Sequence, residues 1–403
     1  MRNLQDYADI IKVIDDPEYA KTKNLKVSEK NGLYLIKYKK EFITNENANT
    51  LGLFRSIITD RNKLLSVAPP KSIPLDVFKE YEYKNCHLQS FEEGTMINIF
   101  FNILNDQWEV ATKSNIGANC TYNTEKTFRT MFLEAMNNIE GLEFEHLDNR
   151  YSYSFILQHP ENKIVIPFKT TNLILCGVYE FNDFSFKNIL YTKEEKEEFA
   201  FDIFSVKTVQ HIEKHEDNIW EDLYEKIKYE EDYKIMGYVI VNKETGERTK
   251  IRNNNYEYVK KLKGNNLKLQ YTYYNLRQHG NVKNYLHFFP EQGEKLLLLR
   301  KNLHDFKKKL YEYYVNCFIK KEKMLKEYPF KFKPHMYNLH QLFLNEMRDK
   351  KEYITLFAVK NYINTLPIPK LMFSMNYDES TRKTDEIKNE IEKTLNSQQE
   401  LII

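Results

Sequence analysis

Few residues in this chain stand at a spacing that catalysis or metal binding requires. His211 and His215 are four residues apart, which would let two imidazoles on one helical face bind a metal ion. The residue beside His211 is Ile212 rather than a glutamate, so we favour an exposed helix face over a metal site. The sequence contains no glycine-rich phosphate loop, no GxSxG and no HExxH. It therefore predicts no metal site and no common motif for nucleophilic catalysis.

Two tyrosine clusters could stack on the bases of a single-stranded nucleic acid. They are Tyr271–Tyr274 and Tyr311–Tyr314. Aromatic residues make up 14% of the whole chain, so clusters of this kind arise readily from ordinary packing. We therefore interpret both clusters as core residues.

Five segments between residues 50 and 260 follow one another in an order that resembles the motifs of phage-type RNA ligases, the RNA ligase 1 class of the covalent nucleotidyltransferases. Phe91–Gly94 is similar to the Lys-x-Asp-Gly adenylation motif, and it precedes a strand-like run and a Lys-Ser turn. Met236–Val239 is similar to Glu-Gly-Tyr-Val. The remaining segments are Leu53–Ser56 with Ala68–Ser72, Ser154–Val165 and Lys250–Tyr256. The resemblance implies common ancestry.

The departures from the family pattern fall on the residues that would carry its chemistry. The resemblance implies a lysine that attacks the α-phosphate of ATP, and carboxylates that hold the ribose and a divalent metal ion. Phe91 stands at the position of the lysine, and Ile156 and Met236 stand at the two carboxylate positions. A benzyl side chain has no lone pair to donate, and no adjacent residue is an evident substitute. We therefore predict no catalytic residue and no metal ligand at this site.

Three apolar replacements in one pocket suggest that the former nucleotide site is now part of the core. Apolar side chains avoid the cost of burying an unpaired charge. This hypothesis predicts that Phe91, Ile156 and Met236 contact one another and fill the pocket.

Five basic residues remain at positions where, by the resemblance, the family contacts phosphates of nucleotide or RNA. They could form a phosphate-binding groove through charge-assisted hydrogen bonds. The alternative is that they pair with Glu92, Glu93 or the acidic stretch 180–232, and the sequence does not decide between the two. The five residues are Arg55, Lys71, Lys113, Lys250 and Arg252.

Two classes of function stay open. The favoured one is a non-enzymatic descendant of an RNA ligase that binds nucleic acid or serves as a scaffold or structural component, with no cofactor. The alternative is an active ATP-dependent ligase or nucleotidyltransferase with a relocated nucleophile, Lys113 or Lys71, which would use ATP and Mg²⁺. An active enzyme should keep at least one of the two lost carboxylates, which favours the first class.

The elements expected to position these residues are β-strands followed by helices. Strand-like runs cover 32–38, 97–103, 108–112, 151–157, 173–179 and 237–241, with helices at 124–138 and 218–228. Helical periodicity then covers 295–323, 335–348 and 354–364. We therefore expect an α+β fold with antiparallel sheets, as the resemblance to ligase domains also implies. The expected parts are a nucleotidyltransferase-like domain over 1–280, an all-α domain over 281–377 and a polar tail over 378–403.

Composition indicates a globular protein of a reducing compartment. Apolar residues make up 41% of the 403 residues, no apolar run is long enough to span a membrane, and the four cysteines form no CxxC pair. The amino-terminal residues lack the apolar run of a signal peptide. Residues 295–333 hold 12 Lys and Arg against 4 Asp and Glu, which suits either a nucleic acid or a solvated helix face.

These features predict an intracellular, cytoplasmic protein without membrane contact. Its expected partners are RNA or another nucleic acid. The chain is rich in lysine, asparagine and tyrosine, a composition typical of an AT-rich genome. Together with the resemblance, this leaves open a viral protein, a place in the virion and viral or host protein partners.

Overall fold

The computed structural model describes residues 1–122, 124–190, 207–208, 219–266, 268–378 and 384. It divides into two compact units, Met1–Lys260 and Lys261–Ile403. The division falls 20 residues before the expected boundary at 280, because α8 (Leu269–Gln278) packs against the long helix α10 (Gly293–Tyr314) of the second unit. Most of the expected tail, 378–403, lies outside the described residues.

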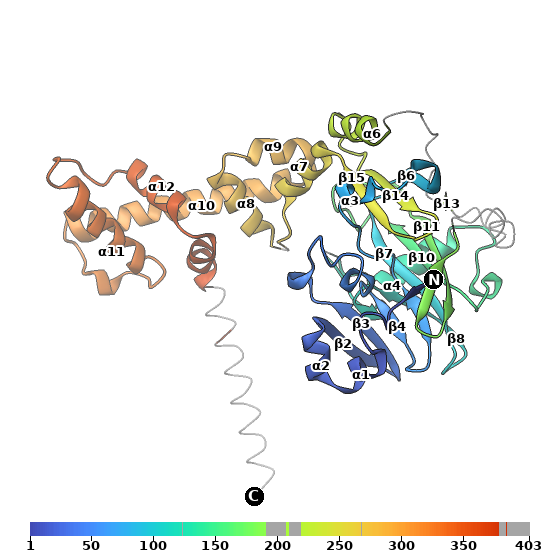
Figure 1. Ribbon diagram of the computed structural model, residues 1–403. Helices are drawn as coiled ribbons and strands as arrows, with labels where there is room; N and C mark the ends of the chain where they lie inside the picture. The colour runs from blue at the N-terminus through green and yellow to red at the C-terminus, as the bar shows by residue number, and fades with distance from the viewer. Residues whose placement is uncertain (123, 191–206, 209–218, 267, 379–383, 385–403) are drawn as a thin grey trace, which may run out of the picture. The chain divides into compact units, whose positions relative to one another are not determined.

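Three sheets make up the first unit (Figure 1). Within the described part of the chain, the largest sheet has eight strands, all antiparallel except for the pairing of β13 with β11. Its order is β1 (Arg2–Asn3), β12 (Ser185–Asn188), β11 (Asn172–Asn182), β10 (Ser152–Gln158), β7 (Thr95–Asn102), β8 (Gln107–Thr112) and β9 (Asn115–Ile116), with β13 (Lys207–Thr208) on β11.

The two smaller sheets are antiparallel. One has the order β15 (Arg248–Arg252), β14 (Gly237–Asn242), β6 (Cys86–Ser90). The other has the order β2 (Leu25–Lys30), β3 (Leu33–Tyr38), β4 (Ile57–Thr59), β5 (Leu64–Val67). The expected strands of this unit are therefore present, with ends that shift by up to three residues. The antiparallel α+β character is confirmed.

The main core lies between the large sheet and helix α4 (Phe128–Asn137). Phe128, Met131, Phe132, Ala135 and Met136 are buried, and their spacing of three and four residues puts them on one helical face. The Thr127 side chain caps the helix by accepting a hydrogen bond from the Thr130 backbone N–H at 3.1 Å. The other α-helices in the described part of this unit are α1 (Ile10–Asp15), α2 (Pro17–Thr22), α3 (Leu75–Phe78) and α6 (Ile219–Lys228), while α7 (Asn254–Lys263) crosses the division.

The second unit is helical in its described part. It contains α8, α9 (Val282–Phe288), α10, α11 (Lys333–Leu342) and α12 (Leu356–Thr365). Strands and turns were expected up to residue 270, but the structure has helices α7 and α8 from Asn254 onward. Tyr273 and Tyr274 are buried in α8, which confirms core packing for that cluster. No helix among the described residues is long and apolar enough to cross a membrane.

Candidate functional site

A basic groove of about 970 Å³ lies on the first unit. Its walls come from the end of β3 and the following loop, the segment after Pro70, the turn between β8 and β9, and strand β15. Ten cationic side chains line it, against a single carboxylate, Glu41, among the described lining residues. The ten are Lys26, Lys37, Lys39, Lys40, Arg55, Lys71, Lys113, Arg248, Lys250 and Arg252.

All five basic residues singled out from the sequence line this groove. They are Arg55, Lys71, Lys113, Lys250 and Arg252, and they come from segments up to 197 residues apart. Lys250 and Arg252 lie two residues apart on β15, so the two-residue period of a strand places them on one face. The structure therefore brings together residues that the chain separates widely.

Arg248 was missed by the reading of the sequence. It precedes Lys250 by two residues in the same strand, so the alternation of β15 could have identified it. Its guanidinium donates to the carbonyls of Pro70 at 2.7 Å and Pro69 at 3.1 Å. Arg55 donates to the same Pro69 carbonyl at 3.0 Å. The two proline carbonyls thus fix two guanidinium groups side by side on the wall of the groove.

Burial and mutual repulsion lower the pKa values of several of these cations. Burial, followed by the charge of Arg248, lowers the pKa of Arg55 to about 10. Burial, followed by Arg55 and then Lys37, lowers the pKa of Lys113 to about 8. Burial and the charges of Arg248 and Arg55 hold the pKa of Lys250 well below its ordinary value. An anion in the groove would relieve this repulsion and is the ligand that the groove fits.

The alternative pairing with Glu92 and Glu93 is absent among the described residues. The Glu93 carboxylate accepts hydrogen bonds from backbone N–H groups of 165 and 166 and from the Tyr256 hydroxyl. Glu92 accepts from Ser90 Oγ at 2.7 Å. Within the described part of the chain, the ion pair of the five basic residues is Arg252 with Glu257, at 3.6 Å. Much of the acidic stretch 180–232 lies outside the described residues, so pairing with that stretch stays open.

The three apolar replacements come from three different segments of the first unit. Phe91 follows β6 in a small sheet and packs against the main core, whereas Ile156 lies in β10 of the large sheet and packs with Ile174 and Cys176. Met236 is half-buried just before β14. The Phe91 backbone N–H donates to the Gly237 carbonyl at 2.8 Å, so Phe91 lies beside the residue that follows Met236. The mutual contact of the three side chains stays a prediction.

Phe91 and Ile156 each have a defined neighbour. The Lys250 ammonium lies 4.0 Å from the centre of the Phe91 ring, a cation–π geometry. Ile156 Cγ2 lies 2.5 Å from where a Cβ on Gly94 would stand, so Ile156 occupies the space beside that glycine. The position of the family's lysine thus carries a ring that supports a lysine from β15.

The described lining of the groove offers few ligands for a divalent metal ion. Mg²⁺ is held by carboxylates and other oxygen ligands, and Glu41 is the one carboxylate among the described groove residues. No group of three or more His, Cys, Asp or Glu in the described residues could hold a metal ion. His211 and His215 lie outside the described residues.

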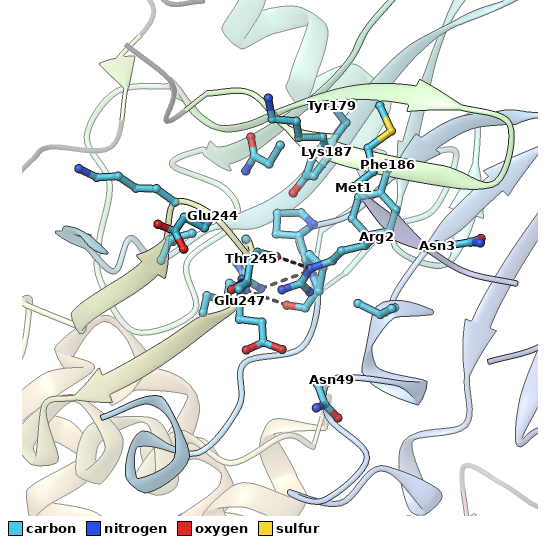
Figure 2. A pocket seen from close by; sticks show the side chains of 18 of the residues that line it. Met1, Arg2, Asn3, Asn49, Tyr179, Phe186, Lys187, Glu244, Thr245 and Glu247 are labelled. Atoms are coloured by element: carbon cyan, nitrogen blue, oxygen red, sulfur yellow. Dashed lines mark hydrogen bonds between the residues drawn. The ribbon is translucent and has the colours of Figure 1, made fainter. Parts of the chain in front are cut away.

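A second cavity of about 420 Å³ shares Arg248 with the groove but differs in charge (Figure 2). Arg2 reaches into it from β1, and its Nε donates to the Thr245 carbonyl at 2.8 Å. Glu244 and Glu247 lie on the same wall, in the turn between β14 and β15 (Figure 2). Acids and bases are thus mixed here, so the excess of positive charge belongs to the groove.

Comparison with known proteins gives one match in sequence. No protein-family model matches the chain. Over 95 residues it is 28% identical to an RNA ligase of Rhodothermus phage RM378, and this match covers 21% of each chain. The chain thus spans about a fifth of the length of this curated relative. The match supports a relationship with RNA-ligase-type nucleotidyltransferases.

Solved structures of ligases are similar to the chain only at a low level. A putative ATP-dependent DNA ligase from Aquifex aeolicus is 14% identical with a TM-score of 0.40, covering 82% of this chain and 79% of that one. An archaeal ATP-dependent RNA ligase is 10% identical with a TM-score of 0.42, covering 92% and 80%. TM-scores this low do not support an argument about function. The sequence match and the groove are therefore the basis for one.

Proposed function

We propose that this protein is a relative of RNA ligases that binds RNA through the basic groove and forms no covalent bond to a nucleotide. The observation that carries the proposal is the composition of the groove, with ten cations and one carboxylate. Lysine and arginine gain free energy by releasing counterions from a phosphate backbone. A groove of this charge therefore suits a chain of phosphates.

The loss of covalent chemistry rests on Phe91 and its neighbours. The Phe91 ring cannot act as a nucleophile, and Ile156 and Met236 cannot bind a metal ion or a ribose hydroxyl. The Lys250 ammonium occupies the face of the Phe91 ring, at 4.0 Å. The residues that remain can bind phosphates, but the groove lacks the carboxylates that would organise a metal–triphosphate complex.

Contact with the backbone rather than with bases is expected to dominate. Tyr38 and Tyr224 are the aromatic residues among the described lining residues, so stacking platforms are few beside ten cations. Affinity should then depend little on RNA sequence and strongly on salt. For single strands the logarithm of affinity falls with the logarithm of salt by about 0.7 for each neutralised phosphate.

The test combines a labelling reaction with a binding measurement on the full chain. The protein is incubated with α-labelled ATP, and separately GTP, with Mg²⁺ or Mn²⁺, and is run on a denaturing gel. Single-stranded RNA binding is measured at several salt concentrations. No labelled band together with salt-dependent RNA binding is the expected result. Failure to bind RNA at low salt would overturn the proposal.

One observation favours a second candidate, an active nucleotidyltransferase with a relocated lysine. The pKa of Lys113 is lowered to about 8, so more of its amine is uncharged near neutral pH. That amine would attack the α-phosphate, form a P–N bond, release pyrophosphate by breaking a P–O bond and lose a proton to water. Lys71 also lines the groove and has a lowered pKa.

A labelled band that is sensitive to acid and stable to alkali would establish this second candidate. Lys113→Arg keeps the charge but removes the readily deprotonated amine, so it should abolish the band. Lys71→Arg is the matched variant, and a band lost only in that protein would move the nucleophile to Lys71.

A further inference from the structure

The second unit contains a cavity of about 870 Å³ that the proposed function does not use. It is lined by residues of α8, α9, α10 and α12, and α8 and α12 both pack against α10. Its volume lies in the range of small-molecule sites. The cavity belongs entirely to the second unit, so it is independent of the basic groove.

The lining combines aliphatic and cationic side chains. Val282, Leu286 and Leu297 are among the aliphatic residues, and five lysine and arginine residues lie with them. No carboxylate stands among the described lining residues. Leu297 is 64% exposed, so the apolar surface continues to solvent. Such a lining matches a ligand with an anionic head and an apolar body.

Lys307 gives the cavity a buried cation. It is 6% exposed and lies on the core face of α10, four residues after Leu303 and three before Leu310. A leucine or methionine would pack at this position without the cost of removing a charge from water. No ion pair or hydrogen bond of its ammonium to another described residue is found. Burial, and then the charges of Arg277 and Lys360, lower the pKa of Lys307 to about 8.

We propose that this cavity binds a single-chain anionic amphiphile, a long-chain carboxylate, whose head group pairs with Lys307 and whose alkyl chain lies along the leucine side chains. An ammonium without a protein acceptor, beside four further cations and no carboxylate among the described lining residues, favours an anionic partner. The aliphatic lining favours an alkyl chain over a nucleotide base. Tyr273, the one Tyr, Phe or Trp among the described lining residues, is 4% exposed and offers no open face for stacking.

The test measures binding of dodecanoate to the full chain by calorimetry, below the concentration at which dodecanoate forms micelles. Saturable binding is expected. Dodecanol has the same alkyl chain without the charge and should bind at least about tenfold more weakly, the loss typical of a charged hydrogen bond. Inorganic phosphate and a short RNA should not displace dodecanoate. Equal affinity for dodecanol, or displacement by phosphate, would overturn the proposal.

Lys307→Met tests the head-group contact directly. It keeps the length and packing of the side chain, and it should weaken dodecanoate binding about tenfold. Lys308→Met is the matched control, because Lys308 is exposed on the same helix and does not line the cavity. The melting temperature of Lys307→Met should be at least that of the unaltered protein, which excludes misfolding as the cause. Unchanged dodecanoate affinity in Lys307→Met would contradict the proposal.

The source of the carboxylate is distinguished with vesicles. Phosphatidylcholine vesicles with and without added oleate are mixed with the protein and floated on a density gradient. Flotation with the oleate vesicles that is lost in Lys307→Met would assign a membrane-borne ligand. Binding of dodecanoate without flotation would assign a free fatty acid. These results do not depend on RNA binding, so this inference and the proposed function can fail separately.

Discussion

Two regions of the first unit differ in whether their charged side chains have hydrogen-bond partners within the protein. Glu93 is 2% exposed, and its carboxylate accepts backbone N–H groups of Val165 and Ile166 at 2.9 Å each and the Tyr256 hydroxyl at 2.7 Å. The groove cations have few protein acceptors and repel one another, which lowers the pKa values of Arg55, Lys113 and Lys250. Glu93 lies two residues after Phe91, which follows the last residue of β6. One region has its hydrogen-bond partners in the protein, whereas we propose that an anionic ligand supplies them for the other.

The difference separates structural from functional charge. A buried carboxylate with three donors ties the segment after Phe91 to the 165–166 segment and to α7, so its removal should cost stability. Clustered cations repel one another in the free protein, so removing one should not lower its stability. Removal should instead weaken the binding of an anionic ligand. Variants of the Glu93 contacts and variants of the groove cations should therefore have different effects.

The largest expected effect is on stability, from Glu93→Ala. Two backbone N–H groups and a buried hydroxyl would lose their acceptor, and the free energy of unfolding should fall by about 3 kcal/mol or more. Tyr256→Phe removes one of the three bonds and should cost about 1 kcal/mol. Urea denaturation measures both. A loss in Glu93→Ala no larger than that in Tyr256→Phe would show that the carboxylate is not the centre of this contact.

The next effect is on RNA affinity, from Lys250→Met. This variant removes a half-buried cation of the groove and should weaken RNA binding about tenfold while the salt dependence becomes shallower. The free protein should become no less stable, because a repelled charge is removed. Lys169→Met is the control, since Lys169 is exposed and outside the groove. Equal RNA affinity of the two variants would place the binding surface elsewhere.

A smaller effect is expected from pH. The pKa of Lys113 in the free protein is about 8, so its positive charge is present below that pH and is lost as the pH rises through it. RNA affinity should therefore decline by a few fold between pH 7 and pH 9. That decline is about the affinity that one lysine–phosphate contact contributes. Lys113→Arg keeps its charge throughout and should flatten this decline. A decline that is identical in both proteins would assign the titration to another group.

The smallest expected effect is from Phe91→Lys. This variant restores the lysine of the family motif, but Ile156 and Met236 still lack carboxylates. It should therefore give no labelled band with α-labelled ATP and a divalent metal ion. The unaltered protein, which should also remain unlabelled, is the reference. Substantial self-labelling by the variant would mean that the former nucleotide site is less degraded than we propose.

Local pattern allowed much of the fold to be predicted, and it failed where contacts between distant segments decide the structure. The β-branched run in Gly237–Asn242 and the helical spacing of apolar residues in α4 allowed those elements to be found. No helix was expected over α7 or α8; α8 packs against α10, a contact between segments that local pattern does not show. Arg248 escaped notice because its role depends on the Pro69 and Pro70 carbonyls.

The sequence alone determined the residue types: a phenylalanine at 91, apolar residues at 156 and 236, and five basic residues in an order that resembles ligase motifs. Tertiary structure decided which of them meet. It gathered the basic residues and five further cations into one groove, and it placed Phe91 and Ile156 in different sheets. The physical reason is that the direction of a side chain follows from the local period of its strand, whereas a groove is formed by strands and loops that are distant in the chain.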